Sequence, residues 1–131
     1  MHQGSCLCKK VQFEIDGEFK GFYLCHCSRC RKATGSAHAS NLFSMSAKLN
    51  WVSGRDHVKT FHLEGTRFQK SFCDNCGSAL PTLHESGRLL VPTGCLDSEM
   101  SMQPTAHIFT GSRALWDKDL ETVVEFAAFP G

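Results

Sequence analysis

Long apolar runs and blocks of like charge are both missing from this sequence. None of its 131 residues lies in a stretch approaching the ~20 consecutive apolar residues that a membrane helix needs, so no membrane partner is expected. Fourteen basic side chains stand against 13 acidic ones, which leaves a formal net charge of +1. Nucleic-acid-binding proteins usually carry a basic stripe. The even balance therefore disfavours nucleic acid as a partner.

The first five residues lack the charged segment and apolar run of a secretory signal. We therefore expect a cytoplasmic location, where thiol buffers oppose disulfide formation. The chain nevertheless has eight cysteines, an even number that would suit a disulfide framework. Their spacing disfavours disulfides, because Cys6 with Cys8, and Cys25 with Cys27, cluster as metal ligands do. The cysteines are expected to bind metal.

Repeats, linkers and low-complexity segments are also absent, and the length suits a single domain over residues 1–131. Short apolar runs are separated by glycine and polar turns, which is typical of strands. Val11, Phe13 and Ile15 alternate with polar residues, so one face of that strand should be buried. This pattern predicts a mainly β domain with little helix.

The predicted elements follow the same pattern along the chain. Strands are predicted at residues 11–15, 22–24, 42–43, 49–52, 58–63, 66–72, 79–83, 89–91 and 107–109. One helical turn is predicted at residues 31–34, with Gly35 ending it. Residues 120–129 suit either a short helix or a terminal strand.

Four cysteines form the first set of candidate metal ligands: Cys6, Cys8, Cys73 and Cys76. Residues i and i+2 of a strand face the same side, so Cys6 and Cys8 can present their sulfurs together. Cys73 and Cys76, followed by Gly77, have the spacing of a tight metal-binding turn. Four thiolates complete a tetrahedral zinc site and leave no position for water or substrate. This set is therefore predicted to be structural.

Cys25, Cys27 and Cys30 form a second set within six consecutive residues. Three protein ligands with one open position is the general plan of a catalytic zinc site. A closed site, completed by Cys95 or a histidine, is the alternative. On spacing alone the pairs can also be exchanged, with Cys25 and Cys27 joining Cys73 and Cys76, and Cys6, Cys8 and Cys30 left as the triplet.

The remaining candidates are histidines and one further cysteine. On a strand, His26 should point away from the metal held by its neighbours, either in contact with the ligands or in a structural role. His38 and His107 are candidates for a pocket wall. Cys95 is expected to be a small buried side chain without a metal. Surface or satisfied core positions are expected for His2, His57, His62 and His84.

Four segments, taken in order, resemble those of a known family. The first is Gly-Ser-Cys-Leu-Cys at residues 4–8, which precedes Val-Gln-Phe at 11–13, and the second is the cysteine triplet followed by Arg-Lys-Ala-Thr-Gly, at residues 25–35. The third is Phe-Cys-Asp-Asn-Cys-Gly-Ser at residues 72–78. The fourth is Pro-Thr-Ala-His-Ile-Phe at residues 104–109, with Trp116 downstream. Over residues 4–116 the chain resembles the glutathione-dependent formaldehyde-activating enzyme family, also called the centromere-protein-V/GFA domain. It departs from the family at Lys9, where glycine is common, and at Cys95, where a small or hydroxyl residue is usual.

The resemblance implies a tent of small antiparallel sheets around two zinc ions. Structural zinc would be held by Cys6, Cys8, Cys73 and Cys76, and catalytic zinc by Cys25, Cys27 and Cys30. The implied activity is that of a carbon–sulfur lyase similar to S-(hydroxymethyl)glutathione synthase, with glutathione as co-substrate. Its partners would be a small-molecule thiol and an aldehyde, and a homodimer is compatible with this assignment.

In this hypothesis the thiol becomes the fourth ligand of the open zinc and reacts with formaldehyde. Arg29, Arg31 or Lys32 would then meet the carboxylates of glutathione. Two other functions fit the same residues: a non-catalytic binding module stabilised by zinc, and a lyase that acts on a different thiol adduct.

Overall fold

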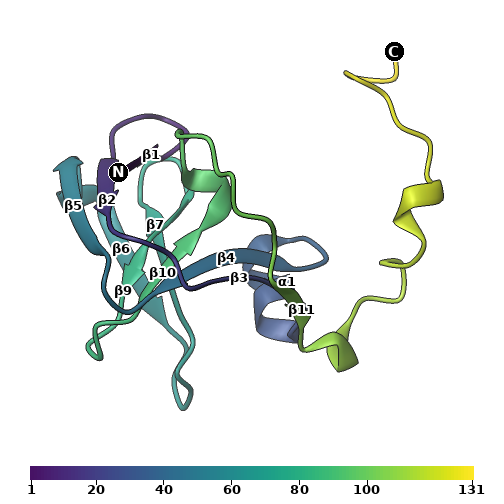
Figure 1. Cartoon of the computed structure of the whole chain (residues 1–131), viewed down its shortest axis with the longest axis horizontal. Helices are drawn as coiled ribbons and strands as arrows, with labels where there is room; N and C mark the ends of the chain where they lie inside the picture. Colours follow the sequence, from purple (N-terminus) through teal and green to yellow (C-terminus); the bar gives the residue numbers. More distant parts are fainter.

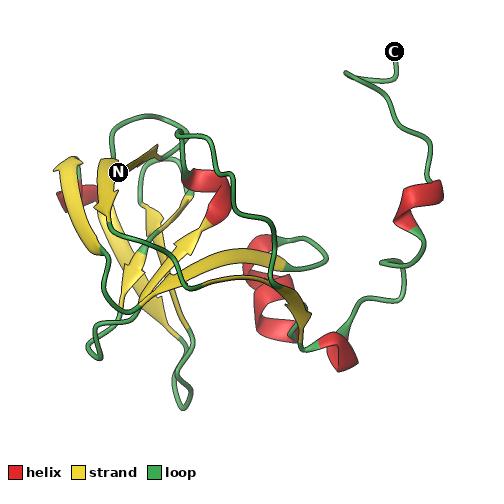
Figure 2. Cartoon of the chain, viewed as in Figure 1, coloured by secondary structure: helices red, strands yellow, loops and turns green.

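Eleven short strands in three sheets, with a single α-helix, make up the fold, which confirms the mainly β class. The structure is a computed structural model that describes residues 1–131 (Figures 1 and 2). The first sheet has the order β1-β2-β5, with β1 at His2–Ser5, β2 at Gln12–Asp16 and β5 at Lys48–Ser53. Each pair of neighbours in this sheet is antiparallel.

The second sheet has the order β11-β3-β4-β10-β9. Its strands are β3 at Gly21–Cys25, β4 at Ala39–Ser44, β9 at Thr82–Leu83, β10 at Leu89–Pro92 and β11 at Ala106–Ile108. The third sheet joins β6 at Val58–His62, β7 at Gln69–Cys73 and β8 at Ala79–Leu80. The α-helix α1 spans Ser28–Thr34, and 3-10 turns lie at Arg55–His57, Thr93–Cys95, Thr110–Ser112 and Leu120–Thr122.

The core forms from inward-facing residues of all three sheets. Val11, Phe13 and Ile15 are at most 1% exposed, which confirms that this stretch buries its apolar face. They belong to the same cluster as Leu42 and Leu80, from the second and third sheets. The buried sulfurs of Cys6 and Cys73 lie in this cluster as well. One set of cysteines is therefore continuous with the hydrophobic core.

Three predictions about strands needed correction. Cys6 and Cys8 were expected on a strand but lie in the turn after β1. The stretch 79–83 was predicted as one strand but is divided between two sheets, β8 in the third and β9 in the second. The break falls at the buried Pro81, which has no backbone N–H to donate to a ladder. The sheets are also not wholly antiparallel, because β11 pairs parallel to β3, with His107 opposite Leu24.

Helix α1 begins earlier than the predicted turn at 31–34. The side chain of Cys27 caps the helix by accepting a hydrogen bond from the backbone of Cys30. Gly35 ends the helix in the left-handed conformation, at φ 67°, as predicted. Cys27 therefore both caps the helix and belongs to the cysteine triplet.

The C-terminal end of the chain, drawn in yellow, runs clear of the body of the protein (Figure 1). The prediction of a helix or strand over residues 120–129 is wrong, since only Leu120–Thr122 forms a 3-10 turn and the rest joins no sheet. Every residue from 118 to 131 is exposed. No helix of the structure has the length and apolar character needed to cross a membrane.

Candidate metal centres and the cavity beside them

The cysteines separate in space into a group of four and a group of three. In each group all the sulfur atoms lie within 4.8 Å of one another. The first group holds Cys6, Cys8, Cys73 and Cys76, and the second holds Cys25, Cys27 and Cys30. The exchanged pairing that spacing alone allowed is therefore wrong. No histidine or eighth cysteine joins either group.

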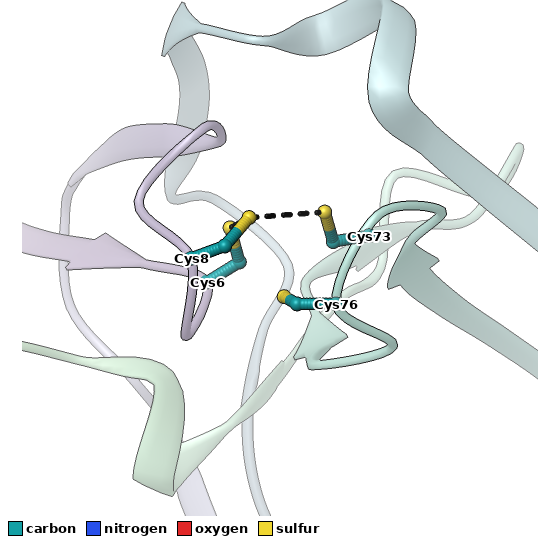
Figure 3. A group of neighbouring side chains, drawn as sticks. All are labelled: Cys6, Cys8, Cys73 and Cys76. Carbon is teal, nitrogen blue, oxygen red and sulfur yellow. Dashed lines mark hydrogen bonds between the residues drawn. The ribbon is translucent and has the colours of Figure 1, made fainter.

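The group of four joins two distant segments of the chain (Figure 3). Cys6 and Cys8 lie in the loop after β1, with sulfurs 3.5 Å apart, and the sulfur of Cys8 lies 3.9 Å from that of Cys73 at the end of β7. Backbone N–H groups point at these sulfurs, from Val11 to Cys6 at 3.3 Å and from Asn75 to Cys73 at 3.4 Å. The arrangement suits a metal ion enclosed by protein.

Local hydrogen bonds favour the thiolate form at part of this group. The hydroxyl and backbone of Ser78 lower the pKa of the Cys76 thiol to about 5. The side chain of Asn75 lowers the pKa of Cys8. Burial instead raises the pKa of Cys73 to about 11, against the opposing effect of nearby backbone N–H groups. The group can therefore supply thiolates at neutral pH, as metal binding requires.

The group of three is built at the junction of β3 and α1. Cys25 ends β3, Cys27 caps α1 and Cys30 lies in its first turn. The backbone N–H of Cys30 donates to the sulfur of Cys27 at 3.3 Å. Burial raises the pKa of both Cys25 and Cys30. Burial acts the same way on Cys27, but the N–H of Cys30 and other bonds outweigh it and lower its pKa.

A cavity of about 630 Å³ opens beside the group of three, and Cys25 and Cys30 are among its lining residues. Its apolar lining includes Phe43, Phe68 and Leu90. Three cationic side chains also line it, namely Arg67, Lys70 and Arg88. No aspartate or glutamate is among the lining residues. Two of the three cysteines thus border a space that is partly apolar and carries positive charge.

The cations predicted to meet a substrate are not the ones at the cavity. Neither Arg29, Arg31 nor Lys32 lines it, and Arg31 donates to the backbone oxygen of Ser112 at 3.0 Å. Sequence reasoning missed the three lining cations because they lie on β7, in the turn before it and before β10, far in the sequence from Cys25, Cys27 and Cys30. Only the folding of these strands around the cavity brings the cations to the triplet.

Three histidines contact one another, and none of them lines the cavity. His26 is fully buried and its Nε2 lies 2.8 Å from Nδ1 of His107. Its ring also packs against His38, with 5.1 Å between centroids. Nδ1 of His26 lies 3.3 Å from the carboxylate of Asp117. Burial, followed by the charge of Arg113, lowers the pKa of His26, so it is neutral at pH 7.

These positions correct the sequence-based view of the histidines. His38 and His107 were candidates for a pocket wall, but neither lines the cavity. His84, assigned to the surface or core, is the histidine that does line it. Cys95 lies away from the triplet and packs against the hydrophobic core, where burial raises its pKa to about 12. It therefore cannot close the three-cysteine site.

Two comparisons with known proteins concern the family and the fold of this chain. The sequence model of a family described as glutathione-dependent formaldehyde-activating enzyme matches residues 1–112. A crystal structure of a protein from Rhodobacter sphaeroides is similar in fold, with a TM-score of 0.59 and 23% sequence identity. The similarity covers 80% of this chain and 98% of that one.

Proposed function

Because the chain belongs to the glutathione-dependent formaldehyde-activating enzyme family, we propose that it is a zinc-dependent carbon–sulfur lyase. It joins, or in reverse releases, a small aldehyde such as formaldehyde and a thiol such as glutathione. The observation that carries this proposal is the opening of a three-cysteine group onto a cavity with three cations and no carboxylate.

Zinc fits both cysteine groups. A tetrahedral zinc ion with Zn–S bonds of about 2.3 Å holds its sulfurs about 3.8 Å apart. The sulfur distances of 3.5 and 3.9 Å in the group of four agree with that value. Cys6, Cys8, Cys73 and Cys76 would hold a structural ion. The second ion would be held by Cys25, Cys27 and Cys30, which leave one of four positions for another ligand.

The reaction requires a thiolate at neutral pH and a carbonyl carbon close to it. Zinc, when bound at the triplet, supplies a vacant position and lowers the pKa of a thiol that occupies it. In the reaction the sulfur of the thiol bonds to the carbon of formaldehyde, and the proton from the thiol ends on the new hydroxyl group. The cavity holds both reactants together, which converts a bimolecular encounter into a local one.

The charge of the cavity supports an anionic thiol as substrate. Glutathione carries two carboxylates, and guanidinium groups are the side chains best suited to bind them. Arg88 lies over the ring of Phe43, 5.6 Å from its centroid, and neither it nor Arg67 forms a salt bridge within the protein. Lys70 donates to the backbone oxygen of Ala33. The two arginines are therefore the groups that we assign to the carboxylates.

Exchange spectroscopy by NMR on mixtures of glutathione and formaldehyde tests this function. The zinc-loaded protein is expected to increase the exchange rate between free and adduct states. The Cys95→Ser variant should retain the increase, because Cys95 belongs to neither cysteine group. Rates equal to those without protein would exclude the reaction. If the protein accelerates exchange only with another thiol or another aldehyde, it is a lyase that acts on a different adduct.

Acid is expected to release the two zinc ions in separate steps, the triplet's ion first. A raised thiol pKa means that protons compete with the metal at higher pH, and burial raises the pKa of Cys25 and Cys30. In the group of four, burial raises the pKa of Cys73, but hydrogen bonds lower the pKa of both Cys8 and Cys76, so protons should displace zinc there only at lower pH. Zinc measured in the filtrate after ultrafiltration at decreasing pH should rise by one ion, then by a second. The Cys27→Ser variant should hold only the ion of the group of four, so its release curve identifies that step. Release of this ion at a higher pH than the ion of the triplet would contradict the expected order.

A further inference from the structure

The segment from residue 118 to residue 131 exposes most of its apolar side chains and has no partner in its own chain. Its large exposed apolar residues are Leu120, Val123, Val124, Phe126 and Phe129. The side chain of Phe129 is 91% exposed. The hydrogen bonds of this segment are local, such as those from Thr122 and Val123 within the 3-10 turn. In Figure 1 the segment runs away from the three sheets. We refer to residues 118–131 as the arm.

The surface area of the chain exceeds that of a compact monomer. Its accessible surface is 8757 Å² at 14.5 kDa. A compact protein of that mass exposes about 6,900 Å², so the excess is about 1,900 Å². A stable interface of standard size buries about 800 Å² on each partner. The excess is therefore large enough to form such an interface, and the apolar side chains of the arm are part of it.

The base of the arm is fixed to the body. Ala114 is only 4% exposed, and the carboxylate of Asp117 lies 3.3 Å from His26 and 3.9 Å from Arg113. Phe109 and Asp119, on either side of this base, both adopt positive φ, at 55° and 53°. Non-glycine residues rarely take this conformation unless their surroundings impose it. The arm thus begins directly after a base that Ala114 and Asp117 hold to the body.

The arm and the cavity carry opposite charges. The charged residues of the arm are Lys118, Asp119, Glu121 and Glu125, a net charge of −2. The cavity carries Arg67, Lys70 and Arg88 with no carboxylate, and its lining is also rich in apolar side chains. An acidic, apolar arm and a basic, apolar surface are complementary. Because one chain carries both, two copies can exchange them reciprocally in a closed twofold dimer.

We propose that the arm packs over the cavity of a second copy of this chain, and that the partner's arm packs over the first cavity. Each cavity would then be walled in part by the other subunit. The arm does not cover its own cavity, because none of residues 118–131 is among the lining residues. The inference concerns assembly and does not depend on the reaction. The arm and an anionic thiol would share the same cations, so the tests below measure mass rather than activity.

Sedimentation velocity of the zinc-loaded full-length protein tests this proposal. The expected mass is twice the 14.5 kDa of one chain. A double variant in the arm, Phe126→Asp with Phe129→Asp, should sediment as a single chain. The matched control is Val52→Asp, which alters a half-exposed apolar side chain on β5, in a sheet outside the cavity lining. The control should remain a dimer. A wild-type protein of one chain's mass, or an arm variant that stays dimeric, would overturn the proposal.

A charge exchange tests where the arm lies. Reversal of the cavity charge by Arg67→Glu with Arg88→Glu should weaken the dimer at least about tenfold, since close charge pairs across an interface are worth about 1.5 kcal/mol or more. Adding Glu121→Arg and Glu125→Arg to the same chain should restore it. Both arginines are exposed, and the circular dichroism spectrum should be unchanged in each variant. If the arginine substitutions leave the dimer as stable as before, or if the added glutamate substitutions do not restore it, the arm packs elsewhere.

Discussion

Replacement of Cys73 by serine is expected to remove one zinc ion and most of the folded state. The sulfur of Cys73 is fully buried in the core cluster, at the point where β7 meets the loop carrying Cys6 and Cys8. A structural zinc ion contributes about 10–16 kcal/mol of apparent binding free energy. Whole domains are stable by only about 5–15 kcal/mol. Loss of the ion should therefore exceed the stability of the domain.

Zinc analysis and circular dichroism measure the outcome for Cys73→Ser. We expect the bound zinc to fall by at least one ion per chain and the thermal unfolding transition to disappear. Cys95→Ser is the matched control, since Cys95 also packs against the core but belongs to neither cysteine group. That variant should keep both ions and a cooperative transition. Two ions and a near-normal transition in the Cys73 variant would remove the structural role of this group.

Replacement of Cys27 by serine is expected to remove the zinc ion of the three-cysteine group while leaving the fold intact. Cys27 is half-buried and caps α1 through its side chain. Serine is one of the best N-cap residues, so it can accept the same hydrogen bond from the backbone of Cys30. The helix start is thereby preserved, while a thiolate ligand is lost. The change of cap alone should cost no more than about 1 kcal/mol.

The activity of Cys27→Ser should fall to the uncatalysed rate of exchange between glutathione and formaldehyde. Zinc content should drop from two ions to one, and thermal unfolding should remain cooperative. The comparison with Cys73→Ser separates the two sites, because one variant unfolds and the other does not. Equal collapse of both variants, or full activity with one ion missing, would contradict the division between a structural and a catalytic site.

The parts of the fold that sequence predicted correctly are local. Alternation at Val11, Phe13 and Ile15 marked a buried face, and Gly35 marked a helix end, because each depends on the backbone geometry of a few neighbouring residues. Short spacing likewise places Cys25, Cys27 and Cys30 close together. These features needed no knowledge of the tertiary fold, whereas the meeting of Cys6 and Cys8 with Cys73 and Cys76 depends on it, because spacing alone also allowed the exchanged pairs.

Other features escaped prediction because they depend on which strands become neighbours. Pro81 divides residues 79–83, which were predicted as one strand, into β8 and β9, and these two strands belong to different sheets. The cations at the cavity, Arg67, Lys70 and Arg88, lie outside the cysteine motifs, while Arg29, Arg31 and Lys32 do not line it despite their place beside the triplet. On a helix or strand, adjacent residues face different directions, so closeness in sequence does not imply a shared cavity.

By itself, then, the sequence determined that this is a mainly β protein with closely spaced cysteines, because strand alternation and cysteine spacing are short-range properties of the chain. The tertiary structure alone decided which cysteines gather into each group, which group borders a cavity, which charges that cavity carries, and that His26 packs against His38 and His107. It also decided that residues 118–131 leave the body with their apolar side chains uncovered. These properties arise from long-range contacts, which no local pattern specifies.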